Sequence, residues 1–550
     1  MHSRDKLSAL RPLLKQEKLD GFLVPRSDAF QGEHVAPCDE RLAWLTGFTG
    51  SAGLAIVLQH RAALFVDGRY TLQARQEVDT ESFEILDVFD PAPSNWLESL
   101  GDELTLGYDP WLHTRAGLER LRAENVTLCP VAANPVDRGW NDRPAAPALP
   151  IPDWPIEYAG QSREEKLHIL REKMAAEGAA ALFLGKPDSV CWALNIRGAD
   201  VPFLPVPRAY GLITQNDAII FCQDRTQQDV NNLPLTFRNH DDLMADLAAV
   251  EGRVWADPAR SPAAVMETLE NTLEEEDPCV RLRAVKNATE IANLKDAHIR
   301  DGVAMVKFIK WLEEEAPHGR LKETDVADKL RALREEDLFY AGFPPFETIA
   351  GYGANGAIIH YHATPETART IAPGNLLLVD SGGQYVLGTT DITRTMAIGK
   401  PSAEMIRAYT SVLRGHIALA RARFPDGTKG AAMDTLARAP LWEEGLDYAH
   451  GTGHGVGCYL DVHEDGAGIH PRFQSPLNPG MLISNEPGYY REDHFGIRIE
   501  NLVLVRDSGG KMDSGKRLLD FETVSLCPLD RALIDPELLS RKELEWLNTY

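Results

Sequence analysis

The sequence of 550 residues lacks long apolar runs and paired cysteines, and it is short of positive charge. No stretch approaches the roughly 18 apolar residues of a membrane-spanning helix, so we expect no membrane partner. The seven cysteines are scattered and form no C-x-x-C pair, which excludes a disulfide framework and a thiolate zinc site. Residues 1–21 are charged throughout and lack the apolar core of a signal peptide. We therefore expect a cytoplasmic protein.

The charge balance is strongly acidic. Lysine and arginine number 57 against 82 aspartates and glutamates, a formal charge of −25. Nucleic-acid binding needs clustered basic residues, so we expect no nucleic-acid partner. The length exceeds what one hydrophobic core supports and favours about three domains.

The first half of the sequence contains a degenerate repeat. An amphipathic helix over residues 4–19 and a strand over 21–25 are matched by a helix over 162–177 and a strand over 180–185. A Trp-centred segment and a further strand, over 63–68 and 218–222, follow in each copy. Alternating helices and strands predict two related α/β domains. The Pro- and Ala-rich residues 143–152 separate them, so we place the domains at 1–150, 151–285 and 286–550.

The last domain begins with a long helical pattern near residues 290–315 and contains a second repeat. Residues 373–380 and 479–486 both read as a Pro-Gly turn, an apolar strand and a carboxylate, Asp380 or Glu486. Two half-domains related by a pseudo-two-fold axis would bring these strand ends together. Chance similarity of two hairpins is the alternative.

Four carboxylates of the last domain, Asp380, Asp391, Glu486 and Glu500, lie in or beside apolar strands, where an unpaired charge is costly. Asp380 and Asp391 fit facing positions on two strands joined by a short turn, although Asp380 alone also fits a simple turn. Glu500 lies in the alternating stretch 497–503, where it would share a strand face with Arg498. A surface Arg–Glu pair is the alternative there. Such buried carboxylates need a cation, a hydrogen-bond cage or a proton.

Two histidines, His450 and His454, stand among four glycines in residues 450–457. The glycines disfavour the helix that an i, i+4 zinc motif needs, so we expect one histidine to bind metal and the other to contact substrate. A glycine-rich loop with incidental histidines is the alternative. Four carboxylates with one imidazole suit Mn²⁺, Co²⁺, Fe²⁺ or Zn²⁺, and their charge is enough for two divalent ions.

These segments resemble the pita-bread metallopeptidases, the family of methionine aminopeptidase, prolidase and Xaa-Pro aminopeptidase. The similarity runs over essentially the whole chain, including residues 39–51, 357–361 and 521–530, and is greatest to the large three-domain type. The resemblance implies a fold of two creatinase/prolidase-type N-terminal α/β domains and a pita-bread catalytic domain. Leu387 departs from the pattern, because an aspartate is expected before residues 388–391.

The resemblance also implies roles for individual residues. The implied metal ligands are Asp380, Asp391, His454, Glu486 and Glu500, with Asp391 and Glu500 bridging two ions. The implied catalytic residues are His360, His463 and Glu486, and the implied substrate-binding residues are His450, Tyr490 and Arg498. The two ions are expected to be Mn²⁺, with Co²⁺, Zn²⁺ or Fe²⁺ as alternatives.

The implied activity is an aminopeptidase that cleaves the N-terminal Xaa–Pro bond with a metal-bridging hydroxide. Glu486 would accept the proton of the hydroxide and His360 would stabilise the oxyanion. The implied substrates are short peptides with proline at position two, and the N-terminal half is expected to form a homodimer. The alternatives are a prolidase, which cleaves Xaa-Pro dipeptides, and a non-catalytic binding protein of the same fold.

Overall fold

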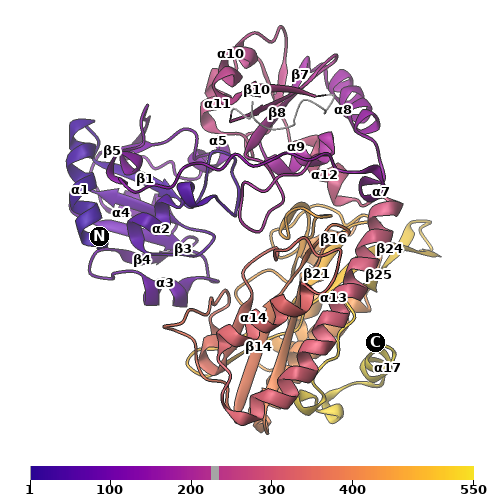
Figure 1. Cartoon of the computed structure of the whole chain (residues 1–550). Helices are drawn as coiled ribbons and strands as arrows, with labels where there is room; N and C mark the ends of the chain where they lie inside the picture. The colour runs from indigo at the N-terminus through magenta and orange to yellow at the C-terminus, as the bar shows by residue number, and fades with distance from the viewer. Residues whose placement is uncertain (1, 224–234) are drawn as a thin grey trace. The chain divides into compact units, whose positions relative to one another are not determined.

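The computed structural model describes residues 2–223 and 235–550. It divides into two compact units, the first formed by Met1–Pro155 with Gln161–Cys279 and the second by Ile156–Gly160 with Val280–Tyr550. Figure 1 colours the first unit indigo to magenta and most of the second from rose to yellow. Each unit is described by itself.

The first unit contains two six-stranded sheets of the same topology. The first sheet has the order β4-β3-β2-β1-β5-β6 and the second has β10-β9-β8-β7-β11-β12. In the first sheet, β1 pairs antiparallel with β2 and parallel with β5. In the second sheet, β7 pairs in the same way with β8 and β11. The strands of the first sheet are β1 (Gly21–Pro25), β2 (Leu54–Leu58), β3 (Ala62–Val66), β4 (Glu84–Asp87), β5 (Leu104–Tyr108) and β6 (Val126–Pro130). Those of the second are β7 (Ala181–Leu184), β8 (Ala209–Thr214), β9 (Ala218–Cys222), β10 (Thr236–Asn239), β11 (Val254–Ala256) and β12 (Thr272–Glu274).

This shared topology confirms the two related α/β domains that the sequence repeat predicted. The predicted helices are observed as α1 (Ser3–Gln16) and α8 (Arg163–Glu177), and the Trp-centred segments form the short helices α2 (Arg41–Thr46) and α9 (Pro187–Leu194). Helix α1 buries Leu7, Leu10 and Leu14, which recur on one face at helical spacing. The start of α8 is fixed by a capping box in which Ser162 and Glu165 satisfy each other's backbone N–H groups.

The second unit holds the strands that carry the predicted site. A three-stranded antiparallel sheet has the order β13-β14-β17, and a six-stranded sheet has the order β18-β25-β24-β21-β19-β20. The strands of the smaller sheet are β13 (Ile349–Tyr352), β14 (Asn375–Ser381) and β17 (Ile392–Ile398). Those of the larger sheet are β18 (Arg423–Pro425), β19 (Gly453–Gly455), β20 (Glu464–Ile469), β21 (Leu482–Asn485), β24 (Asn501–Lys511) and β25 (Arg517–Thr523). Two short hairpins complete the strands, β15 (Gln384–Tyr385) with β16 (Gly388–Thr389) and β22 (Gly488–Arg491) with β23 (Phe495–Arg498).

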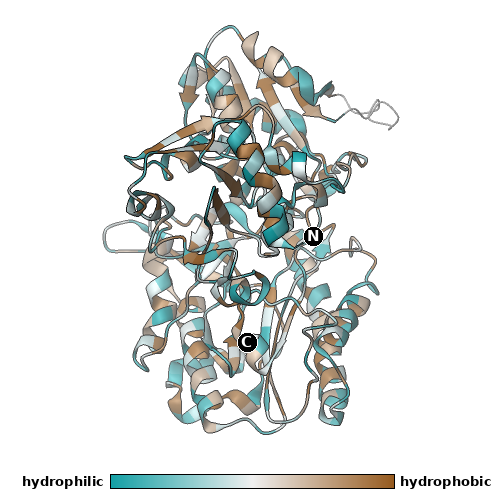
Figure 2. Cartoon of the chain, turned by 90° about the vertical axis from the view of Figure 1, so that its left-hand side faces the viewer, coloured by the Kyte–Doolittle hydropathy of each residue, from teal (hydrophilic) through white to brown (hydrophobic). Residues whose placement is uncertain are grey.

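Four amphipathic helices cover these sheets. The predicted long helix is α13 (Ala288–Glu315), and it packs with α14 (Glu323–Arg334) on β14 and β17. Residues of α16 (Gly430–Trp442) pack on β21 and β24, and residues of α15 (Ala403–Ala420) pack on β23. In Figure 2 the helices carry both teal and brown residues, as expected for helices with one face in a core. The strands next to the carboxylates are therefore packed against helices.

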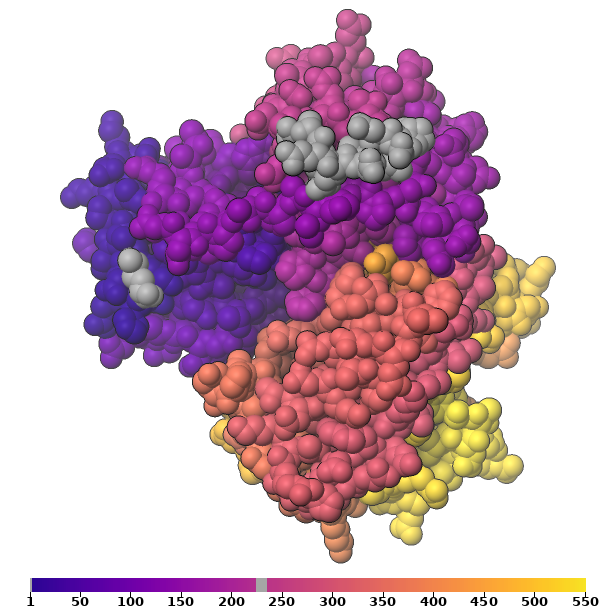
Figure 3. Space-filling model, viewed as in Figure 1, coloured from indigo at the N-terminus to yellow at the C-terminus, as the bar shows by residue number. Residues whose placement is uncertain are grey.

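The surface of the second unit includes a broad area built from residues near 290–340, coloured rose and salmon in Figure 3. Helix α13 exposes Ile299, Val303 and Val306 while burying its opposite face. Across the two described ranges, none of the helices combines the length and the apolar character that a membrane crossing requires.

Candidate metal centre

Two of the predicted ligands come from the pair β14 and β17. Asp380 lies near the end of β14 and is opposite Thr393, whereas Asp391 comes directly before β17. The expectation that Asp380 and Asp391 face each other was therefore wrong by two residues. The connection between the strands is longer than a tight turn, because β15 and β16 form a small hairpin within it. Both carboxylates are nevertheless buried at one end of this sheet.

The two glutamates come from the larger sheet. Glu486 follows β21 immediately, and its backbone N–H donates to the carbonyl of Thr452 at 2.8 Å. Glu500 lies between β23 and β24, so the continuous strand expected over residues 497–503 is interrupted at this glutamate. Because of this interruption, Arg498 and Glu500 both contact Thr393. The Thr393 hydroxyl donates to Glu500 Oε2 at 2.8 Å and lies 3.3 Å from Arg498 Nε.

His454 lies in the short strand β19, which agrees with the expectation that the glycine-rich segment is not helical. Its Nε2 is 3.5 Å from Asp391 Oδ2 and 3.4 Å from Glu486 Oε1. The ring of His463 lies 4.5 Å from the ring of His454, nearly perpendicular to it. One histidine of the pair 450 and 454 thus contacts the carboxylates directly, and His463 borders it.

The electrostatics of this cluster favour cations. Burial raises the pKa of Asp391 and Glu500 well above the ordinary carboxyl range, and the charges of the neighbouring carboxylates raise it further. Burial raises the pKa of Glu486 to about 7, although the nearby Arg498 lowers it. Crowded carboxylates of this kind are stabilised by metal ions or by protons.

The hydrogen-bond partners of the carboxylate oxygens show whether the cluster fits a metal ion. Among the described residues, Asp380 Oδ1, Asp391 Oδ1 and Glu500 Oε1 are buried and have no hydrogen-bond partner. Ligand atoms of Asp391, His454 and Glu500 all lie within 4.8 Å of one another. Buried acceptors are normally satisfied, so three unpartnered carboxylate oxygens beside one imidazole fit a divalent-metal centre rather than a structural ion pair.

Arg498, Tyr490 and His450 form a chain beside the carboxylates. Arg498 donates to Asp380 Oδ2 from Nη2 at 2.7 Å and from Nε at 3.2 Å. Its Nη1 donates to the Tyr490 hydroxyl at 2.6 Å, and that hydroxyl lies 2.8 Å from His450 Nε2. The three residues assigned to substrate binding from sequence are therefore brought together, with Arg498 also bonded to Asp380.

His360 lies in the turn after the 3₁₀ helix η5 (Gly353–Ala357) and is half-buried. The carbonyl of the preceding residue, Ile359, accepts a hydrogen bond from Arg498 Nη2 at 3.3 Å. The backbone of this turn is thereby fixed to the residue that also holds Asp380.

Sequence reasoning missed several residues that hold the cluster. Thr393 donates to Glu500, and the Ser484 hydroxyl donates to Glu486 Oε1 at 3.2 Å while accepting from the backbone N–H of His454 at 2.9 Å. Each stands two residues from a predicted ligand, which places it on the same strand face. That spacing was the signal available in the sequence, since polar residues on a buried strand face require partners.

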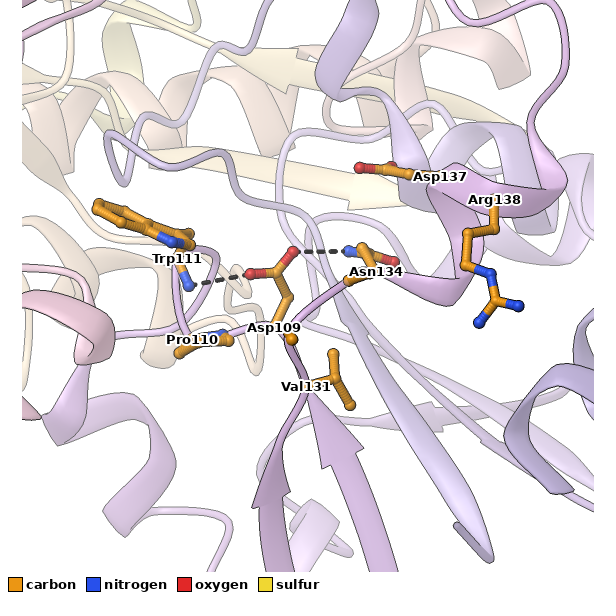
Figure 4. Close-up of a pocket in the computed structure, with 9 residues that line it drawn as sticks. Asp109, Pro110, Trp111, Val131, Asn134, Asp137 and Arg138 are labelled. Atoms are coloured by element: carbon orange, nitrogen blue, oxygen red, sulfur yellow. Dashed lines mark hydrogen bonds between the residues drawn. The ribbon is translucent and has the colours of Figure 1, made fainter. Parts of the chain in front are cut away.

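A separate cavity of about 540 Å³ lies in the first unit, at the carboxyl ends of β5 and β6. Figure 4 shows Asp109 at its centre, accepting from the backbone N–H of Trp111 and from the Asn134 side chain, both at 3.0 Å. Both carboxylate oxygens are therefore satisfied, unlike those of the metal centre.

Comparisons with known proteins agree with this site. The model of metallopeptidase family M24 matches residues 292–507, and the C-terminal region of that family matches 517–550. Two creatinase/prolidase N-terminal domain models match residues 6–137 and 142–290. This succession confirms the expected fold class.

Relatives match along the full length of the chain. The "Probable Xaa-Pro aminopeptidase P" of Laccaria bicolor is 39% identical, over 100% of this chain and 89% of that protein. "Aminopeptidase P1" of Arabidopsis thaliana is 36% identical, over 99% of this chain and 95% of that protein.

Solved structures give the same result. The X-prolyl aminopeptidase of Caenorhabditis elegans, described as a cytosolic enzyme with a di-nuclear active site, superposes with a TM-score of 0.95. It is 32% identical and covers 100% of this chain and 95% of its own. The buried carboxylate–histidine cluster and these full-length similarities together show that the chain belongs to metallopeptidase family M24, among members of the aminopeptidase P type.

Proposed function

We propose that the chain is a metal-dependent aminopeptidase that releases the N-terminal residue from peptides with proline at position two. The observation that carries this proposal is the convergence of four carboxylates, three of them buried, with His454 at one place, and three carboxylate oxygens there are unpartnered among the described residues. The Laccaria bicolor relative is named as a probable Xaa-Pro aminopeptidase, and the Arabidopsis thaliana relative as an aminopeptidase.

Two divalent ions fit the charge of the cluster, and Mn²⁺ suits its oxygen-rich ligands. Asp380, Asp391 and Glu500 would hold one ion, and Asp391, His454, Glu486 and Glu500 would hold the other. When bound, the ions would supply Lewis acidity toward the scissile carbonyl and lower the pKa of a water molecule.

The protein residues have separate tasks in the proposed reaction. Glu486, whose Oε1 lies 3.4 Å from His454 Nε2, is placed to accept a proton and to pass it to the proline nitrogen that leaves. His360 would donate to the developing oxyanion, with His463 bordering His454. His450, Tyr490 and Arg498 would form the wall against which the substrate lies. The Xaa–Pro bond has no N–H, so recognition depends on the shape of this wall and on the substrate carbonyls.

The test is a panel of X-Pro-X and X-Ala-X tripeptides and X-Pro dipeptides, assayed with Mn²⁺ and after stringent chelation. We expect cleavage of X-Pro-X alone, lost on chelation and restored by Mn²⁺. Cleavage confined to X-Pro dipeptides would favour the prolidase alternative. Absence of any turnover with bound metal would favour the non-catalytic alternative, against which the retention of all five ligand residues argues.

We further propose domain boundaries near residues 150 and 285. The change between the compact units at Cys279 and Val280, and the family models ending at residues 137 and 290, support this division. Limited proteolysis that cleaves first near these positions is the expected outcome.

We also propose a cytoplasmic homodimer. The seven cysteines are all free, as is usual in a reducing compartment, and the worm enzyme is described as cytosolic. Light scattering is expected to give twice the chain mass, and a monomer would contradict the dimer. Cell fractionation tests the compartment.

A further inference from the structure

A second layer of buried polar residues lies behind the carboxylate cluster. We call it the support layer, and it consists of Arg394, His416, Asn485, Asn501 and Tyr550. All but Tyr550 are almost completely buried. Asn485 directly precedes Glu486 and Asn501 directly follows Glu500, so the layer is joined by the backbone to two of the proposed ligands.

Arg394 is the centre of the support layer. Its Nη1 donates to the backbone carbonyls of Glu500 at 2.7 Å and Thr393 at 2.9 Å. Its Nη2 lies 2.8 Å from Asn501 Oδ1 and 2.8 Å from the Tyr550 hydroxyl. The planar guanidinium thus fixes both residues on either side of the Glu500–Asn501 bond, because its donors have a rigid arrangement.

Tyr550 reaches this arginine from the end of α17 (Arg541–Thr549). Its hydroxyl lies 3.2 Å from Asn501 Oδ1 and accepts from the backbone N–H of Cys527 at 3.2 Å. The Tyr550 ring stacks on Trp546 at 5.1 Å between centroids, and Trp546 meets the ring of His416 edge-on at 6.0 Å. Helix α17 therefore contacts the support layer at two points.

His416 joins the two asparagines. Its Nδ1 lies 3.1 Å from the Asn485 carbonyl, and its Nε2 lies 3.1 Å from Asn501 Nδ2, which donates to it. The Asn485 side chain in turn donates to the His416 carbonyl at 2.9 Å. The His416 imidazole thereby connects the backbone of Asn485, next to Glu486, with the side chain of Asn501, next to Glu500.

The charges of the layer also relate it to the cluster. Among the described residues, no carboxylate forms an ion pair with Arg394, and every one of its hydrogen-bond partners is neutral. Burial and the charge of Arg394 lower the pKa of His416 to about 3, so the imidazole stays neutral and keeps one donor and one acceptor. The charge that Glu500 carries when it is ionised contributes to the raised pKa of Arg394.

We propose that Tyr550 is a positioning residue for the metal centre: its hydroxyl, through Arg394 and Asn501, sets the placement of Glu500 and with it the affinity for the ions. The inference rests on the proposed function only in taking Glu500 as a ligand. Groups that orient metal ligands without touching the metal commonly change metal affinity by about 10- to 100-fold when removed.

The test is Tyr550→Phe, which removes the hydroxyl and keeps the ring on Trp546. The matched control is Tyr352→Phe, because the Tyr352 hydroxyl donates to a backbone carbonyl of the second unit, that of Ala372, and forms no hydrogen bond with a proposed ligand among the described residues. Mn²⁺ is titrated calorimetrically into each chelator-treated full-length protein. We expect Tyr550→Phe to bind Mn²⁺ at least about tenfold more weakly, with Tyr352→Phe unchanged. At limiting Mn²⁺ the kcat of Tyr550→Phe for an X-Pro-X tripeptide should fall with little change in KM, and excess Mn²⁺ should restore kcat.

The outcomes separate the two proposals. Wild-type protein that takes up no Mn²⁺ would overturn the proposed function and this inference with it. Wild-type uptake matched by equal affinity in Tyr550→Phe would overturn the inference alone. If Tyr550→Phe does not fold, Trp546→Phe replaces it, since this change loosens the stack that holds Tyr550 and should weaken Mn²⁺ binding in the same direction. Unchanged affinity in that variant would also overturn the inference.

Discussion

Arg498 is bonded to Asp380 by two donors, at 2.7 and 3.2 Å, while the other oxygen of Asp380 is buried without a partner among the described residues. The arginine therefore neutralises one oxygen of Asp380 and leaves the second oxygen without a donor. This arrangement links His450 and Tyr490, which we propose to line the substrate site, to a proposed metal ligand, so substrate binding and metal binding should respond together to mutation.

Replacing His454 with Ala is expected to lower turnover of an X-Pro-X tripeptide by about two orders of magnitude or more, because a ligand matters at least as much as the residues that orient it. The control is His494→Ala, since His494 is exposed and lies in a turn. Metal content and circular dichroism of the two variants are measured alongside the rate. Full activity in the His454 variant would refute its role as a ligand.

Chelation should make stability depend on pH. The pKa of Glu486 in the folded chain is raised to about 7, so between about pH 4.5 and 7 the folded chain holds more protons than the unfolded chain. The free energy of unfolding of the metal-free protein should therefore fall as pH rises through this range. Metal binds the ionised carboxylates, so the stabilisation by Mn²⁺ should grow over the same range. Thermal unfolding as a function of pH, with chelator and with Mn²⁺, measures both stabilities. If the two stabilities changed with pH in parallel, the prediction would be contradicted.

Tyr490→Phe removes the hydroxyl between Arg498 and His450. A hydrogen bond to a charged group is worth about 1.5–3 kcal/mol, so kcat/KM for X-Pro-X peptides should fall by roughly tenfold or more. Tyr489→Phe is the matched control, because its ring packs in the core beside the site. Equal losses in the two variants would show that the Tyr490 hydroxyl has no specific role.

Asp301→Asn should destabilise the second unit by about 3–5 kcal/mol, because it leaves a buried cation without its partner. Asp301 of α13 accepts from Arg334 Nε at 2.7 Å and from the Tyr385 hydroxyl at 3.0 Å, and Arg334 also donates to Ser381, the residue after Asp380. Denaturant unfolding gives the free energy. The double change Asp301→Leu with Arg334→Met should cost less, and an equal or larger loss would show that the charges themselves are not the cause.

The sequence predicted the fold where local signals were strong. Helical patterns marked α1, α8 and α13 to within a few residues, and an apolar run marked β1. The repeat in the first half corresponds to two sheets of identical topology. The ligand candidates were visible because each carboxylate adjoins an apolar strand. The register between β14 and β17 was not predictable, because the hairpin of β15 and β16 adds residues that follow no strand pattern.

The break between β23 and β24 was likewise not evident in the sequence, since residues 497–503 alternate as a continuous strand would. The support layer was missed for another reason. His416, Arg394 and Tyr550 are far apart along the chain, and only the tertiary fold brings them together. Patterns within a short window do not reveal such contacts.

The proposed ligands are divided between two sheets, since Asp380 and Asp391 adjoin β14 and β17 whereas His454, Glu486 and Glu500 adjoin β19, β21 and β24. Bound cations would therefore act as a removable cross-link between the halves of the second unit. No short segment of the chain contains all the proposed ligands, so we expect metal uptake to follow the pairing of these two sheets. Loss of metal should then open the protein to proteases at the seam between these sheets before either sheet unfolds.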